Sequence, residues 1–293
     1  MADTGSRNDV LSTEAKAFYR HAMTGLQKAG VPFLVGGAYA FARYTGIERH
    51  TKDFDIFVHR RDVDAVFEIL DTQGCRTELT FPHWLGKAYC GSEFVDVIFS
   101  SGNGVAEVDD AWFEHSVEEI VLDTAVRLIP PEEMIWSKAF IMERERYDGA
   151  DIAHVLRARG PELDWQRLLR RFDDNWRVLF SHLALFGYVY PSERDKVPDW
   201  VLGELMGRLE AELAAPAPGG RLCQGTILSR EQYLVDIERW GYRDARRLPG
   251  GTMTAAEIQR WTAAIDEEPA GSNGARTGSA SDRPAPPDGA EAA

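Results

Sequence analysis

The first half of the chain alternates between helical and extended patterns of apolar and polar residues. Residues 12–29 are typical of a helix that begins at Ser12 or Thr13 and ends before Gly30. VPFLV at 31–35 is a short apolar run that stops at a Gly-Gly pair, which predicts a buried strand. The pattern then predicts a helix at 38–45, a strand at 53–58, a helix at 61–74, strands at 76–81, 84–90 and 93–100, and a strand at 126–130.

The pattern becomes helical after residue 130. We expect helices at about 132–146 and 149–158, followed by several more to about residue 265. The residues after 265 are Gly, Ala, Ser, Pro and acids without aromatics, so they cannot bury enough apolar surface to fold. The sequence therefore predicts an α/β domain at 1–130, an all-α C-terminal half at 131–265 and a disordered tail at 266–293.

Three aspartates stand out on the predicted strands. Asp53 and Asp55 are two residues apart on 53–58, so they share a face with Phe57, while Phe54, Ile56 and Val58 face the core. Asp96 lies on 93–100, which follows a predicted hairpin turn at Gly91-Ser92. Carboxylates held side by side repel one another, and a divalent cation such as Mg²⁺ relieves that repulsion. The alternative interpretation is a set of solvated acids on strand faces.

Composition narrows the class of protein. The chain has 293 residues with a formal net charge of −14, and 44% of its residues are hydrophobic. No apolar run reaches the ~18 residues of a membrane span, and the N-terminus lacks a secretory pattern, so we expect a cytoplasmic protein. No basic stripe matches a nucleic-acid backbone, although a local basic groove remains possible. The spacing of Cys75, Cys90 and Cys223 predicts neither a disulfide framework nor a zinc site.

Gly36 and Gly37 follow the strand at 31–35 and precede the short helix. Two glycines at such a turn allow a positive φ and close approach of a ligand, and a helix N-terminus favours phosphate. The same pair also fits a tight connection without a ligand. The sequence contains no P-loop motif, and its seven histidines lack metal-binding spacing.

The chain resembles the nucleotidyltransferase fold of the DNA polymerase β superfamily in Gly36-Gly37, Asp53-Phe54-Asp55 and the later strand residue Asp96. The likeness covers about residues 30–160 and is strongest to small bacterial members, including antibiotic-modifying and toxin-type enzymes. It implies a nucleotidyltransferase-type mixed sheet with flanking helices, two Mg²⁺ ions and a nucleoside triphosphate (NTP) donor. Gly36 and Gly37 would cradle the triphosphate, Asp53, Asp55 and Asp96 would bind metal, and Asp96 would help to deprotonate the acceptor.

The segment KAFIMERERYDGADIAHVL at 138–156 resembles the start of the helical half in related bacterial proteins. By that resemblance Lys138 contacts phosphate or nucleotide, and Asp148 or Asp151 holds either Lys138 or the acceptor. In the alternative interpretation Asp148 is an N-cap and Asp151 supports the helix start. Lys52, together with Arg49 and Thr51, precedes the acidic pair and is a further candidate for phosphate contact.

The sequence thus predicts magnesium-dependent transfer of a nucleotidyl group to a hydroxyl. The acidic balance favours a small-molecule or protein acceptor over RNA, which stays possible. The alternative is a catalytically inactive nucleotidyltransferase-like module that binds a nucleotide or a partner.

Overall fold

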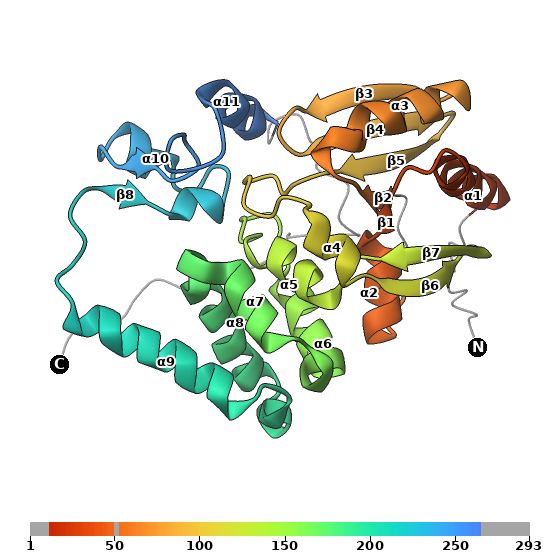
Figure 1. Ribbon diagram of the computed structural model, residues 1–293. Helices are drawn as coiled ribbons and strands as arrows, with labels where there is room; N and C mark the ends of the chain where they lie inside the picture. The colour runs from red at the N-terminus through yellow and green to blue at the C-terminus, as the bar shows by residue number, and fades with distance from the viewer. Residues whose placement is uncertain (1–11, 50–52, 265–293) are drawn as a thin grey trace, which may run out of the picture.

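The computed structural model describes residues 12–49 and 53–264. One half of the molecule is a mixed sheet of seven strands in the order β3-β4-β5-β2-β1-β7-β6 (Figure 1). The strands are β1 (Leu34–Val35), β2 (Asp53–Phe57), β3 (Arg76–Phe81), β4 (Leu85–Cys90), β5 (Glu93–Ile98), β6 (Val117–Val121) and β7 (Thr124–Leu128). Pairs β2–β5 and β1–β7 are parallel, and the remaining neighbours are antiparallel.

Helices flank the sheet and build the other half of the molecule (Figure 1). They are α1 (Thr13–Lys28), α2 (Gly37–Thr45), α3 (Val63–Thr72), α4 (Asp110–Glu114), α5 (Pro131–Ala139), α6 (Gly149–Arg159), α7 (Trp165–Phe172), α8 (Trp176–Val189), α9 (Asp199–Ala214), α10 (Leu234–Glu238) and α11 (Ala255–Ala263). Between α9 and α11 lies a two-stranded parallel pair, β8 (Leu222–Cys223) and β9 (Arg243–Asp244). The predicted α/β sheet with a helical C-terminal half is confirmed. The predicted tail at 266–293 lies outside the described residues, and the domain boundaries stay a prediction.

Helix α1 begins where the sequence predicts and packs on the strand that carries the acidic pair. Ser12 caps it by accepting a hydrogen bond from the Ala15 amide at 2.9 Å. The Tyr19 ring on its buried face stacks on Phe54 of β2, with ring centroids 4.6 Å apart. One face of β2 is therefore fixed by the core, which leaves the aspartates on the other face.

Two features of the α/β half were not predicted from the sequence. Phe57 shares the aspartate face by alternation, yet it is buried because its ring stacks on Trp112 of α4 at 5.4 Å. Strand β6 was not predicted, because its sequence is rich in glutamate and it pairs only with β7 in the described sheet. The turn between them uses Leu122 and Asp123 at positive φ, so no glycine marks it.

The cysteine prediction is also wrong, since Cys75 and Cys90 form a disulfide. Arg76 pairs with Tyr89 in the β3–β4 hairpin, which brings Cys75 and Cys90 together just beyond that pair, with Cα atoms 4.6 Å apart. Spacing along the sequence does not reveal such cross-strand neighbours. Cys223 is buried and unpaired in the described part of the chain.

The helix predicted at 132–146 ends at Ala139. Beyond it, Met142 and Tyr147 form an isolated antiparallel bridge, so residues 141–148 make a small hairpin. Glu143 anchors this hairpin to the C-terminal region, because its carboxylate accepts hydrogen bonds from the Ser229 hydroxyl at 2.6 Å and the Arg230 amide at 3.0 Å. This tertiary contact overrides the local helical pattern.

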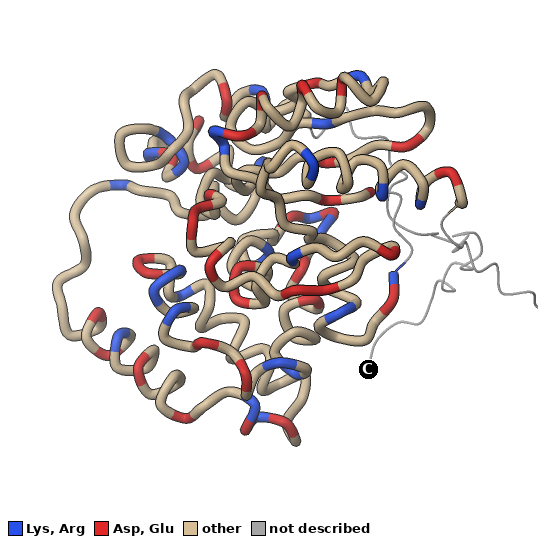
Figure 2. The backbone as a smooth tube through the Cα atoms, turned by 45° about the vertical axis from the view of Figure 1, so that its right-hand side comes forward, with Lys and Arg blue, Asp and Glu red and all other residues tan. Residues whose placement is uncertain are grey.

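Acidic and basic positions are interspersed over both halves of the described chain (Figure 2). Among the described residues, no helix is long and apolar enough to cross a membrane.

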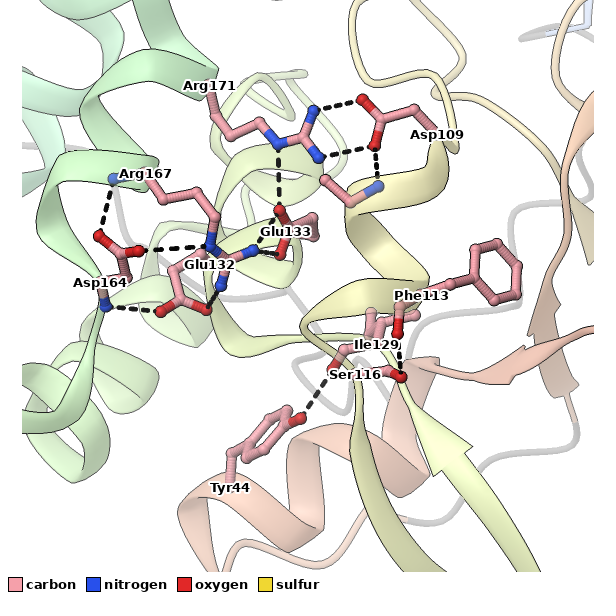
Figure 3. A network of polar contacts seen from close by, with 11 residues as sticks. Tyr44, Asp109, Phe113, Ser116, Ile129, Glu132, Glu133, Asp164, Arg167 and Arg171 are labelled. Carbon is pink, nitrogen blue, oxygen red and sulfur yellow. Dashed lines mark hydrogen bonds and ion pairs between the residues drawn. The ribbon is translucent and has the colours of Figure 1, made fainter.

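A buried ion cluster joins α4, α5 and α7 (Figure 3). Arg167 pairs with Glu132 and donates to both oxygens of Glu133 at 2.6 Å. Arg171 donates to Glu133 at 3.0 Å and forms a two-pronged pair with Asp109 at 2.6 and 2.7 Å. Glu133 is fully buried, and burial raises its pKa although the two arginines oppose the change. The cluster thus fixes the helical half against the loop that leaves the sheet.

The C-terminal region returns to the far end of the sheet (Figure 1). Trp261 of α11 packs edge-on against Phe81 at the end of β3, with ring centroids 5.0 Å apart, and against Trp84 at 5.2 Å. Gly102 lies beneath the same indole, where a Cβ would come within 2.4 Å of it. The end of edge strand β3 is therefore completed by residues from the last described helix.

Candidate functional site

Three charged side chains form one row across the middle of the sheet. In the strand register, Asp55 of β2 lies opposite Asp96 of β5, and Asp96 lies opposite Lys87 of β4. Residues opposite one another project from the same face. The Lys87 ammonium donates to Asp96 Oδ1 at 2.7 Å. This register places Asp55 and Asp96 on one face of the sheet.

The Gly36-Gly37 turn lies directly against Asp55. The Gly36 amide donates to the Asp55 carbonyl at 3.0 Å, and Gly37 has a φ of +54°. A Cβ at Gly37 would lie 1.7 Å from Asp55 Oδ2, so only glycine leaves room for the carboxylate. Helix α2 begins here without a side-chain cap, which leaves the first amides of the helix as donors for an anion.

Replacing Gly37 with alanine is expected to destabilise the protein by more than the positive φ alone explains. The added methyl group displaces the Asp55 carboxylate, and the left-handed backbone adds about 1–2 kcal/mol of strain. Thermal melting measures the loss of stability. Gly46→Ala is the matched control, because Gly46 has a φ of +72° with nothing within 4 Å of its Cβ position. Equal losses in Gly37→Ala and Gly46→Ala would contradict the prediction.

The acidic face is electrostatically unfavourable. Burial raises the pKa of Asp55 to about 7, and the neighbouring Asp96 and Asp53 act in the same direction. Burial also raises the pKa of Asp96, opposed by Lys87. Asp53 is exposed at the start of β2. A divalent cation would offset the repulsion between these three carboxylates.

Among the described residues, no group of three His, Cys, Asp or Glu side chains stands close enough to hold a metal ion by itself. Mg²⁺ is commonly held by one or two carboxylates together with water and substrate phosphates. The hard oxygen donors of Asp55 and Asp96 fit that mode, in which the nucleotide completes the coordination.

A second charged network lies on the helical side. Lys138 of α5 pairs with Asp148 at 2.7 Å and with Asp151 at 2.8 Å. Arg146 forms a two-pronged pair with Asp148 at 2.9 Å, and Arg49 donates to Asp151 at 2.5 Å. The positive charges of Lys138 and Arg146 oppose the rise in the pKa of Asp55, so this network is within electrostatic range of the acidic row.

The structure thus places most predicted site residues in two neighbouring groups. Asp148 does not act as a side-chain N-cap, because its carboxylate is taken up by Arg146 and Lys138. Lys52 and Thr51 lie outside the described residues. The sequence analysis assigned no role to Lys87 or Arg146.

Comparison with known proteins identifies the family. A family model described as uncharacterised nucleotidyltransferase matches residues 6–185, and the chain belongs to this family. No curated protein sequence matches the chain significantly.

Several solved structures match the chain at low identity. The antibiotic-resistance factor ANT(2'')-Ia is 16% identical with a TM-score of 0.37, over 69% of this chain and 96% of that one. The lincosamide antibiotic adenylyltransferase LnuA, solved with lincomycin, is 16% identical with a TM-score of 0.36, over 49% and 96%. An antigenic nucleotidyltransferase-like protein from Paracoccidioides brasiliensis is 14% identical with a TM-score of 0.34, over 59% and 93%.

Proposed function

We propose that the protein is a magnesium-dependent nucleotidyltransferase. It moves a nucleoside monophosphate from an NTP to an acceptor hydroxyl and releases pyrophosphate. The observation that carries this proposal is the direct register of Asp55 and Asp96 on adjacent parallel strands, with the Gly36-Gly37 turn packed against Asp55. The acidic balance of the sequence favours a small-molecule or protein acceptor, with RNA as a further possibility.

The residues of the site take separate roles in the proposed reaction. The acceptor oxygen forms a bond to the α-phosphorus, the bond from that phosphorus to the β-phosphate oxygen breaks, and Asp96 takes the hydroxyl proton. Asp55 and Asp96, with Asp53 at the start of β2, would hold the cations together with the substrate phosphates, while Gly36 and Gly37 and the first turn of α2 would hold the triphosphate. When bound, magnesium supplies positive charge that activates the attacking oxygen and stabilises the departing pyrophosphate.

The helical network supports the same assignment. Lys138 offers an ammonium for phosphate or nucleotide contact, and Asp151 orients it through their 2.8 Å pair. Lys52 is a further candidate for phosphate contact. A module that binds nucleotide without turnover gives no reason to keep the half-buried Asp55 beside a second carboxylate, so this arrangement favours catalysis.

Thermal melting with each of the four NTPs, with Mg²⁺ and with EDTA, tests this function. We expect one NTP to stabilise the protein only with Mg²⁺, by about 2.7 kcal/mol at a hundred times its dissociation constant. Asp96→Asn should lose this shift, whereas Glu118→Gln, an exposed carboxylate on β6, should keep it. Pyrophosphate release with a metabolite extract as the acceptor source then separates transfer from binding. Absence of any metal-dependent shift in the folded wild type would reject the proposal.

A further inference from the structure

Lys87 contacts the acidic row directly, yet the proposed reaction gives it no role. The strand register places it opposite Asp96, and its ammonium lies 2.7 Å from Asp96 Oδ1. It also lies 4.4 Å from the centre of the Phe94 ring, which is a favourable cation–π distance. Lys87 therefore occupies one oxygen of a carboxylate that the proposed function assigns to metal binding.

The pair is shielded from water. The exposed fractions of the side chains are 22% for Lys87 and 14% for Asp96. Charges interact more strongly in such surroundings than on an open surface. Lys87 balances one of the two carboxylates in its row and leaves the charge of Asp55 uncompensated within that row.

We propose that Lys87 is an exchangeable counter-ion of Asp96, which holds this carboxylate in the nucleotide-free protein and leaves it when metal and nucleotide bind together. An ammonium and a divalent cation repel one another strongly at the same carboxylate. The flexible lysine stem lets the ammonium turn from Asp96 to the incoming triphosphate, whose negative charge compensates it. The inference rests on the proposed function, because it takes Asp96 as a metal ligand.

The consequence is that bare metal binds weakly and that the metal–nucleotide complex binds as one unit. Without Lys87, the free carboxylates of Asp55 and Asp96 attract a cation even before nucleotide arrives. A merely structural ion pair would not behave in this way, since losing it would lower stability without raising metal affinity.

Binding of Mn²⁺, followed by the electron paramagnetic resonance signal of the free ion, tests this role. Lys87→Met is expected to bind Mn²⁺ without nucleotide about tenfold or more tightly than wild type. Lys87→Arg keeps the charge and should resemble wild type. Lys28→Met, which removes an exposed positive charge from the end of α1, is the control for net charge. Adding Asp96→Asn to Lys87→Met should remove the gain.

Lys87→Gln provides a second, polar variant should Lys87→Met fail to fold, and thermal melting verifies each protein. Unchanged Mn²⁺ affinity in folded Lys87→Met and Lys87→Gln, while wild type binds Mn²⁺ with its NTP, would overturn the role of Lys87 alone. If wild type binds no Mn²⁺ even with any of the four NTPs, the proposed function falls and the role of Lys87 with it.

Discussion

Asp55→Asn is expected to lose nucleotidyl transfer by about a thousandfold or more while the metal-free protein becomes more stable. The loss follows because an amide is a poor substitute for a carboxylate in cation binding. The gain follows because Asp55 is half-buried beside Asp96 and Asp53, and the loss of hydration and the neighbouring charges raise its pKa from 3.8 to about 7. A tenfold change in an acid dissociation constant corresponds to about 1.4 kcal/mol, so we expect a gain of roughly 2–4 kcal/mol at pH 8.

The pH dependence of this gain follows from the direction in which the pKa of Asp55 moves on folding. The folded protein holds a proton on Asp55 up to about pH 7, whereas the unfolded chain releases it near 3.8. The wild type therefore loses stability as the pH rises between these values. The advantage of Asp55→Asn should grow from pH 4 to pH 7 and then level off, as measured by thermal melting in EDTA. Glu118→Gln should show no such trend, and an Asp55→Asn protein no more stable than wild type at pH 8 would contradict the argument.

Arg167→Met is expected to cause the largest loss of stability, about 3–5 kcal/mol. Arg167 is buried and pairs with both Glu132 and Glu133, whose side chains are 5% and 0% exposed (Figure 3). Removing it leaves two buried carboxylates with only Arg171 nearby among the described residues of the cluster. Urea denaturation at pH 7 measures the difference in the free energy of unfolding.

The matched control is Arg177→Met. Arg177 pairs with Glu212, and the side chains of this pair are 54% and 49% exposed, so losing it should cost about 0–1 kcal/mol. Combining Arg167→Met with Glu132→Gln and Glu133→Gln should recover part of the loss, because the uncompensated charges disappear. Equal losses in Arg167→Met and Arg177→Met would show that the buried cluster does not stabilise the fold.

The placement of the acidic residues was predictable because it depends on local alternation. Asp53 and Asp55 share a face in any straight strand, whereas the match of Asp96 to Asp55 also needs the pairing of β2 with β5. The position of Lys87 was also within reach of the sequence. A two-residue turn at Gly91-Ser92 pairs the residues on either side of it, and counting back along both strands pairs Lys87 with Asp96.

Other features depend on contacts between distant parts of the chain, which local patterns do not contain. The helix after residue 130 stops at Ala139 because Glu143 is held by Ser229 and Arg230. The same hairpin brings Arg146 to Asp148. The helix predicted over these residues did not indicate that contact. The Cys75–Cys90 bond likewise needs the register of β3 against β4.

The packing of Trp261 against Phe81 and Trp84 also determines when the sheet can be finished during synthesis. All seven strands of the sheet precede the helical region in the chain, so they leave the ribosome long before α11 is made. Until then the aromatic side chains at the end of edge strand β3 lack their contact with Trp261, and exposed apolar surface on an edge strand invites pairing with other chains. We therefore expect nascent or truncated chains that end before α11 to aggregate through β3. In the complete chain, we expect the contacts of Trp261 with Phe81 and Trp84 to form last.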